Sequence, residues 1–118
     1  MKKNRLGFIS ICKINYFDKI TPSNKNVSNL EGYLKLVEIA KSYFDNNELD
    51  DFTGYFQDGQ YFINLWAAHL VIEYGNPSIF WRDKALEIII RYSGNPLAPE
   101  VALEEKKWIE LNYPQFCS

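Results

Sequence analysis

The sequence predicts an all-α fold of five or six helices, stacked in pairs as a short α-α superhelix. Apolar residues recur at three- and four-residue steps over residues 28–113, as they do on buried helix faces. Gly-Asn-Pro occurs at 75–77 and again at 94–96, each time after an aliphatic run and a tyrosine. The 118 residues, 47% of them hydrophobic, suffice for one core. We therefore expect one helical domain over 1–118, with 28–113 as its repeat-like part.

The N-terminal part of the chain is expected to form a helix over 5–19, followed by a polar loop over 21–29. The apolar run 6–12 follows a basic leader, as in a signal peptide, but Lys13 ends it early and no small-residue cleavage site follows. Its β-branched and aromatic residues also suit a strand, which remains an alternative. A lone strand would have no partner, so a helix is preferred.

The next two helices are predicted over 28–44 and 48–56. Ser28 and Glu31 have the spacing of a capping box, in which each side chain bonds the other residue's backbone N–H. Asp-Gly at 58–59 indicates a turn. One apolar stripe should bury the first of these helices, and it consists of Leu30, Tyr33, Leu34, Val37, Ala40 and Phe44.

Three more helices are predicted over 60–74, 78–92 and 98–112. Gly75 is expected to end the first of them in the left-handed conformation, which glycine adopts without strain. Asn-Pro at 76–77 should then begin the next helix, with asparagine as the cap and proline in the first turn. Each of these helices carries a broad apolar face.

Residue types that carry enzyme chemistry are sparse. The sequence has no glycine-rich phosphate loop and no Gly-x-Ser-x-Gly turn. His69, the only histidine, has no nearby cysteine, and its place on an apolar helix face predicts a packed side chain with one hydrogen bond. Cys12 and Cys117 are interpreted as reduced thiols of a cytoplasmic protein, with a bridge as the alternative. We therefore expect that the protein is not an enzyme and that it binds neither a metal nor a cofactor.

The distribution of charge is more informative. Residues 1–41 carry a net charge of +5, residues 42–81 have six acidic and no basic side chains, and residues 82–118 carry −1, which sums to −2. A pI of about 5.4 argues against direct binding of nucleic acid. No apolar stretch approaches the roughly 20 residues of a membrane span.

The acidic stretch 42–81 also holds eleven aromatic residues, more than one short helix face can bury. Carboxylates that steer encounter, next to aromatic anchors, are typical of a surface for a basic protein partner. The alternative is a solvated acidic face over an aromatic core. Trp66 and Trp81 are expected in the core, with Tyr55 and Tyr61 as exposed anchors. The predicted partner-binding residues are Asp45, Glu48, Asp50, Asp51, Tyr55, Asp58 and Tyr61.

Three segments carry a resemblance to a known class of proteins. Residues 66–70 (Trp-Ala-Ala-His-Leu), 85–89 (Ala-Leu-Glu-Ile-Ile) and 99–103 (Pro-Glu-Val-Ala-Leu) resemble small HEAT/armadillo-like bacterial proteins. Such proteins are often immunity proteins, encoded beside polymorphic or contact-dependent growth-inhibition toxins. The resemblance implies a short HEAT/armadillo-like superhelix and a stoichiometric inhibitor that covers a toxin's active site. It implies no catalytic residue.

The resemblance and the charge map together favour one hypothesis. A toxin that cleaves RNA or DNA is basic around its active site because it holds phosphates, and carboxylates can take the place of those phosphates. The expected partner is therefore a cognate toxin domain, a basic nuclease. Two alternatives remain: a small helical adaptor for an unrelated basic protein, and an enzyme with a carboxylate site.

Overall fold

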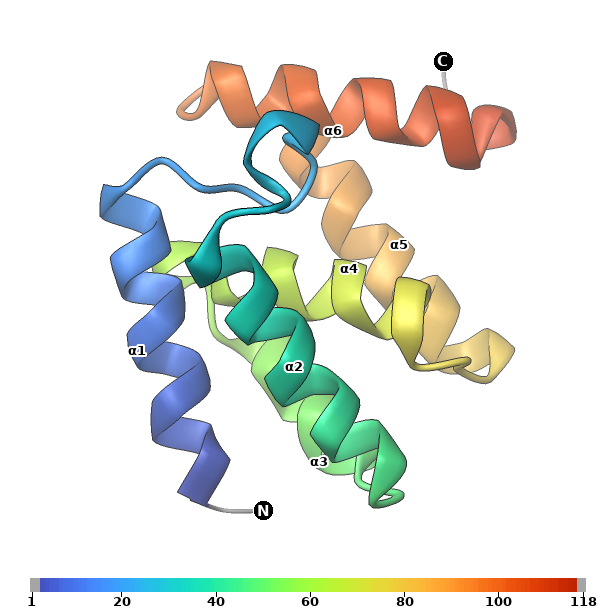
Figure 1. Cartoon of the computed structure of the whole chain (residues 1–118). Helices are drawn as coiled ribbons and strands as arrows, with labels where there is room; N and C mark the ends of the chain where they lie inside the picture. The colour runs from blue at the N-terminus through green and yellow to red at the C-terminus, as the bar shows by residue number, and fades with distance from the viewer. Residues whose placement is uncertain (1–2, 117–118) are drawn as a thin grey trace.

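The computed structural model describes residues 3–116, and their side chains from residue 7 onward. Within that range the chain contains only helices, so the all-α prediction is confirmed (Figure 1). Six α-helices follow one another: α1 (Lys3–Phe17), α2 (Glu31–Asp45), α3 (Leu49–Phe52), α4 (Ile63–Tyr74), α5 (Ile79–Ser93) and α6 (Pro99–Asn112). Four short 3-10 helices join them: η1 (Lys25–Val27), η2 (Thr53–Gln57), η3 (Gln60–Phe62) and η4 (Pro114–Phe116).

Helix α4 lies at the centre of the molecule. All nine residues from Ile63 to Val71 are buried, as expected for a helix that is apolar on every side. Helix α2 packs against α4, and α1 packs against both of them. Helix α5 packs against α4, and α6 packs against α5, so that the last three helices each rest on the next (Figure 1).

The N-terminal segment is a helix, and the strand alternative is wrong. Its buried residues Phe8, Cys12 and Asn15 follow a spacing of four and then three, so they share one helix face. That face contacts α2 and α4, which means that the first helix completes the core. The helix runs over Lys3–Phe17 rather than 5–19.

Helix α2 begins three residues later than expected, and the capping box does not form. Ser28 ends the 3-10 turn η1, and its Oγ donates to the carbonyl oxygen of Lys25 at 3.0 Å. Leu30 holds the cap position without a side-chain hydrogen bond. The Ser28 hydroxyl group therefore bonds within its own turn and does not cap α2.

Four of the six residues of the predicted α2 stripe lie on the core side. Ala40 is buried, and Tyr33, Val37 and Phe44 are half-buried and pack against the core. Leu30 and Leu34 instead remain 43% and 53% exposed, while Leu36 and Tyr43, outside the predicted stripe, are buried. Three- and four-residue spacing fits both sets, so the periodicity alone does not fix the centre of the buried face. The packing of α2 against α1 and α4 determines which face is buried.

The segment between α2 and α4 is broken into short helices. The helix predicted over 48–56 is observed as α3 followed by η2. Tyr61 and Phe62 then adopt left-handed φ angles of 51° and 58°, which delays the start of α4 to Ile63. Two bulky residues in this conformation are costly, and nothing in the spacing of apolar residues indicates them.

Gly75 ends α4, but not in the left-handed conformation. Its φ is −89°, and Asn76 takes the left-handed position instead, with φ 47°. A Cβ atom at Gly75 would lie 2.7 Å from the carbonyl oxygen of Val71 and 2.9 Å from Cδ1 of Leu49. Glycine is therefore required here by the close approach of a backbone carbonyl of α4 itself and of Leu49 from α3.

The expected cap of α5 is also wrong in detail. Ser78, rather than Asn76, holds the cap position, and its Oγ accepts from the backbone N–H of Trp81. The second Gly-Asn-Pro differs at its asparagine. Gly94, with φ −107°, resembles Gly75, but Asn95 does not take a positive φ, and its Oδ1 accepts from the N–H of Leu97. The two triplets thus end their helices in different ways, so their common sequence does not reflect a repeated turn geometry.

The close packing at Gly75 gives the first testable prediction. We expect Gly75→Ala to lower the free energy of unfolding by about 1–3 kcal/mol, because the added methyl group has no room. Gly59→Ala is the matched control, since an added Cβ there meets no atom within 4 Å. Urea denaturation of both variants measures the difference. Equal stabilities would contradict the assigned packing.

Candidate functional site

Four of the predicted carboxylates share one connection, between the end of α2 and the start of α3. Asp45 is the last residue of α2, Glu48 precedes α3, and Asp50 and Asp51 lie in its first turn. Glu48 is half-exposed and the other three side chains are exposed. We call these four residues the acidic corner.

Backbone hydrogen bonds hold the acidic corner tightly. The N–H of Asn46 donates to Ser42 O, and the N–H of Glu48 donates to Tyr43 O at 2.8 Å. Asn47 allows the turn because asparagine tolerates the left-handed conformation, and its φ is 59°. The chain reverses within a few residues, so four negative charges are gathered at one end of the α2–α3 pair.

The carboxylates of the acidic corner are free of other side chains. Over residues 7–116, none of the four forms an ion pair or a side-chain hydrogen bond; the ion pairs found there involve Glu31, Glu73, Asp83 and Glu105. Their charge is therefore not neutralised within the described side chains. Such a concentration of one sign attracts cationic groups from solution.

Asp58 is separate from the acidic corner. Its Oδ1 accepts from the N–H of Gln60 at 3.0 Å, and its carbonyl oxygen accepts from the N–H of Asn64, so it organises the start of α4. Burial, and then the charge of Asp58, raise the pKa of the Cys12 thiol, which places this carboxylate near α1. The structure thus brings together four of the five predicted carboxylates.

Tyr55 is not an exposed anchor. Its side chain is only 5% exposed, its ring centroid lies 4.4 Å from that of Phe8, and its hydroxyl group is 3.0 Å from that of Tyr43. The expectation failed because η2 directs Tyr55 and Phe56 into the core together with Phe52. Aromatic composition predicts which residues pack, but not from which side.

Tyr61 is half-exposed, as an anchor requires, but it lies against α1. Its ring is 5.5 Å from Tyr16 and 6.1 Å from Phe17, and Lys13 Nζ lies 5.7 Å from its centroid. Trp66 is 1% exposed, as predicted. Trp81 is half-buried, with its ring 6.0 Å from Phe56.

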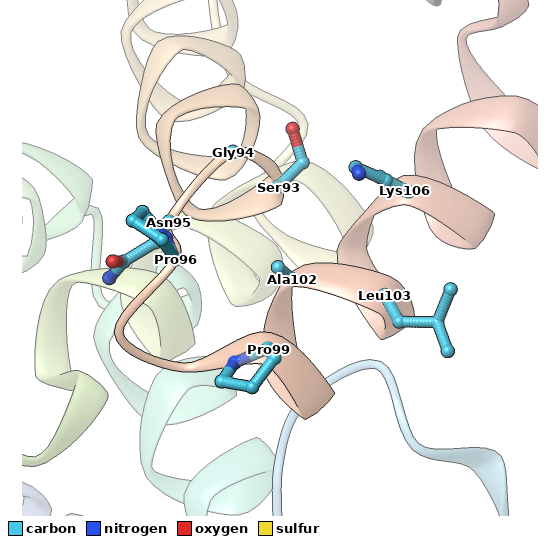
Figure 2. Close-up of a pocket in the computed structure, with 8 residues that line it drawn as sticks. All are labelled: Ser93, Gly94, Asn95, Pro96, Pro99, Ala102, Leu103 and Lys106. Atoms are coloured by element: carbon cyan, nitrogen blue, oxygen red, sulfur yellow. The ribbon is translucent and has the colours of Figure 1, made fainter.

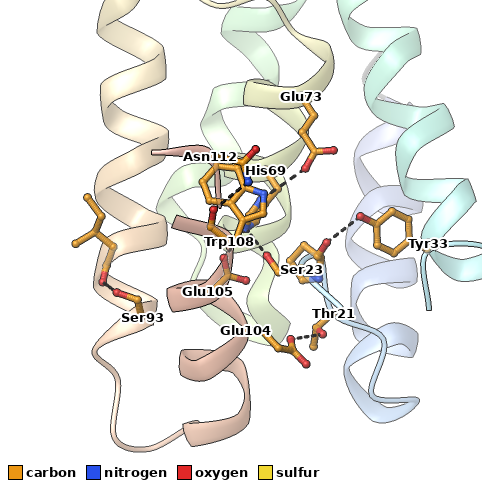
Figure 3. Close-up of polar contacts among 12 residues, drawn as sticks. Thr21, Ser23, Tyr33, His69, Glu73, Ser93, Glu104, Glu105, Trp108 and Asn112 are labelled. Atoms are coloured by element: carbon orange, nitrogen blue, oxygen red, sulfur yellow. Dashed lines mark hydrogen bonds and ion pairs between the residues drawn. The ribbon is translucent and has the colours of Figure 1, made fainter. Parts of the chain in front are cut away.

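His69 is packed, as predicted, but its partners were not foreseen. The side chain is 2% exposed, its ring stands edge-on to Trp108 at 4.6 Å, and Nε2 lies 2.6 Å from Glu105 Oε1 (Figure 3). Ser23 Oγ is 3.1 Å from the same nitrogen. A nucleophilic triad needs the hydroxyl group and the carboxylate on opposite ring nitrogens. Here Glu105 shares Nε2 with Ser23, and the carboxylate on the other side, Glu73 Oε2, lies 3.9 Å from Nδ1, beyond hydrogen-bond distance.

Glu105 is a buried carboxylate that was not among the candidate residues predicted from the sequence. It is fully buried on α6, four residues after Val101 and three before Trp108, on the apolar face of that helix. This position on an apolar helix face could have indicated a buried polar contact, because a carboxylate on a buried face needs a partner. The partner, His69, is 36 residues away in the sequence.

The loop after α1 passes beside His69, and hydrogen bonds of the Thr21, Ser23 and Tyr33 side chains hold it in place. Thr21 Oγ1 donates to Glu104 Oε1 at 2.6 Å, and Tyr33 Oη donates to the carbonyl oxygen of Pro22 at 2.8 Å (Figure 3). Burial raises the pKa of Glu104, and the hydrogen bond from Thr21 opposes that rise. The hydrogen bonds of this loop therefore join α2 and α6 around the buried His69–Glu105 pair.

A groove between α5 and α6 has little that could act chemically. Its volume is about 500 Å³, and Pro96, Pro99, Ala102 and Leu103 form much of its lining (Figure 2). The hydroxyl group of Ser93 donates to the carbonyl oxygen of Ile90 in its own helix at 2.6 Å. No acid or histidine lines this groove within the described residues.

Comparison with known proteins leaves the resemblance untested. No protein-family model, curated protein or solved structure matches the chain. Over the described residues, no helix combines the length and the apolar character needed to cross a bilayer. In the same part of the chain, no three His, Cys, Asp or Glu side chains gather where they could hold a metal. Cys12 is a buried free thiol, and Cys117 lies outside the described residues.

Proposed function

We propose that the protein is a stoichiometric inhibitor of the immunity-protein kind, which binds a cognate basic toxin domain, a nuclease, in the cytoplasm. The observation that supports this proposal is the acidic corner, with four carboxylates in seven residues and no cation paired with them over the described side chains. Unpaired surface charge of one sign favours a partner of the opposite sign.

A nuclease presents lysine and arginine side chains to the phosphates of its substrate. Carboxylates on a rigid turn accept hydrogen bonds from the same groups, and such charge-assisted bonds are about twice as strong as neutral ones. The inhibitor would thus occupy the surface that the nucleic acid needs. Because the turn is already held by backbone hydrogen bonds, little ordering is required on binding.

The apolar anchor of the interface must be reassigned, because Tyr55 is buried. Tyr74 is 39% exposed and immediately precedes Gly75, which packs against Leu49 beside Glu48. Lys41 Nζ on α2 lies 4.9 Å from the centroid of the Tyr74 ring, so one face of the ring already has a cation of the same chain beside it. The exposed part of the ring can supply the buried contact area that carboxylates lack. We propose Tyr74 for this role. Asp58 and Tyr61 remain predicted contacts only for a partner that also covers the α1 side.

The test is a titration of the toxin domain encoded beside the gene of this protein. Nuclease activity should fall in proportion to added protein and reach zero at one equivalent, and affinity should weaken as salt rises. Inhibition that needs a large excess, or that is insensitive to salt, would contradict the proposal. Turnover of a substrate by the purified protein alone would favour the enzyme alternative.

A further inference from the structure

A pocket with polar walls lies between the first turn of α4 and the C-terminal end of α5. Its volume is about 380 Å³, which lies within the range of small-molecule sites. Among the described residues, its lining consists of Asn64, Arg91, Tyr92 and Asn95. None of the proposed toxin contacts belongs to this lining, so the pocket needs a separate explanation.

Asn64 presents unused hydrogen-bond donors to the pocket, although it is only 7% exposed. Its Oδ1 accepts from the hydroxyl group of Tyr92 at 2.7 Å, which orients the amide. Its Nδ2 donates no hydrogen bond within the described part of the chain, and it is not among the enclosed polar atoms without a partner there. The two N–H bonds of Asn64 Nδ2 are therefore accessible to a ligand in the pocket.

The amide of Asn95 is oriented in the same way. Its Oδ1 accepts from the backbone N–H of Leu97 at 2.9 Å, so the oxygen of this amide is also engaged. Its Nδ2 donates no hydrogen bond within residues 7–116. The free polar atoms of both amides are thus donors, and they match a ligand that offers acceptors.

Arg91 supplies a positive charge to the same pocket. Its side chain is exposed, and it forms no ion pair with the side chains that the structure describes. Burial raises the pKa of Tyr92, and the charge of Arg91 opposes that rise, which places the guanidinium near the Tyr92 hydroxyl group. A guanidinium has five N–H donors and no acceptor, and its planar fork fits the paired oxygens of a carboxylate or a phosphate.

Three carboxylates of the chain lie near the pocket without lining it. Asp58 and the fully buried Glu105 also raise the pKa of Tyr92, and Asp58 Oδ1 already accepts from a backbone N–H. Glu87 lies one helical turn before Arg91, on an adjacent groove that Arg91 also lines. None of the three is paired with Arg91 among the described side chains. These charges weaken the attraction for an anion, but they do not fill the pocket.

We propose that this pocket binds a small oxyanion, a carboxylate or a phosphate group, with Arg91 as counter-ion and the amides of Asn64 and Asn95 as donors. Charge-assisted hydrogen bonds of this kind are about twice as strong as neutral ones. Because the Oδ1 atom of each amide is already bonded, the donors need little ordering on binding. The site does not depend on the proposed toxin inhibition, since the acidic corner lies beside the opposite end of α4.

The probes are acetate and inorganic phosphate, titrated separately into the isotope-labelled full chain, with sodium chloride holding the ionic strength constant. We expect at least one of them to shift the side-chain N–H signals of Arg91, Asn64 and Asn95 in NMR spectra in a saturable way. The dissociation constant should lie in the millimolar range, as the small size of the probes allows. Tighter binding of acetate identifies a carboxylate as the ligand, and tighter binding of phosphate identifies a phosphate group.

Two variants and one control test the roles of the lining residues. Arg91→Gln should weaken binding at least tenfold, because the charge that strengthens the hydrogen bonds is removed. Asn95→Asp replaces the free N–H donors with an oxygen and should weaken binding as strongly, while the other oxygen still accepts from the N–H of Leu97 and keeps the turn. Arg82→Gln, which removes the same charge from α5 but from a guanidinium paired with Asp83, should leave binding unchanged.

The absence of shifts with both anions, shifts that rise without saturation for both, or equal binding by Arg91→Gln and Arg82→Gln would overturn the oxyanion site. Toxin inhibition is measured separately and involves neither probe. A failure of this site would therefore leave the proposed function standing, and a failure of toxin inhibition would leave the oxyanion site standing.

Discussion

Reversal of two charges in the acidic corner, Asp50→Lys with Asp51→Lys, should abolish protection against the toxin. The double variant changes the local charge by four units and places two cations against a basic partner. Like charges across an interface cost several kcal/mol, so the dissociation constant should rise about a hundredfold or more. Isothermal titration calorimetry measures the dissociation constant, and survival of toxin-expressing cells measures protection.

The fold should tolerate this change, because both side chains are exposed and neither forms an ion pair over residues 7–116. Glu87→Lys with Glu110→Lys is the matched control, since both residues are exposed and the net charge changes equally. If the two double variants weaken binding to the same extent, overall charge rather than the acidic corner drives association, and the proposed site is wrong.

Glu105→Ala should cost about 3–5 kcal/mol of unfolding free energy. Glu105 is fully buried, and its Oε1 lies 2.6 Å from His69 Nε2. Its removal leaves a cavity and deprives the His69 imidazole, which is only 2% exposed, of its strongest hydrogen bond. Urea denaturation measures the loss.

The neighbouring residue provides the control. Glu104 is only partly buried and makes one hydrogen bond, to Thr21, so Glu104→Ala should cost about 0.5–1.5 kcal/mol. A loss for Glu105→Ala no greater than that for Glu104→Ala would show that the buried pair does not stabilise the fold as the geometry implies.

The helices could be predicted from the sequence because each has apolar residues at helical spacing. Helix α1 is the exception, because its residues also suit a strand and a helix was preferred only since a lone strand would have no partner. In the structure Phe8, Cys12 and Asn15 share one buried helix face. The ends of the helices were harder to predict. Ser28 and Gly75 each have two structural uses, and only the neighbouring elements decide between them.

The candidate site was partly predictable for the same reason. The residues of the acidic corner are close in the sequence, so one turn brings them together. Tyr55 was misplaced because its neighbours Phe8 and Tyr43 come from other helices. The pairing of His69 with Glu105 depends on the packing of α6 near α4, which no local pattern specifies.

Hydrogen–deuterium exchange on the complex with the toxin domain tests most directly whether the acidic corner is the binding surface. We expect toxin binding to slow exchange of the backbone amides over residues 45–51 and at the end of α4. Slowed exchange confined to α5 and α6, with residues 45–51 unchanged, would contradict it.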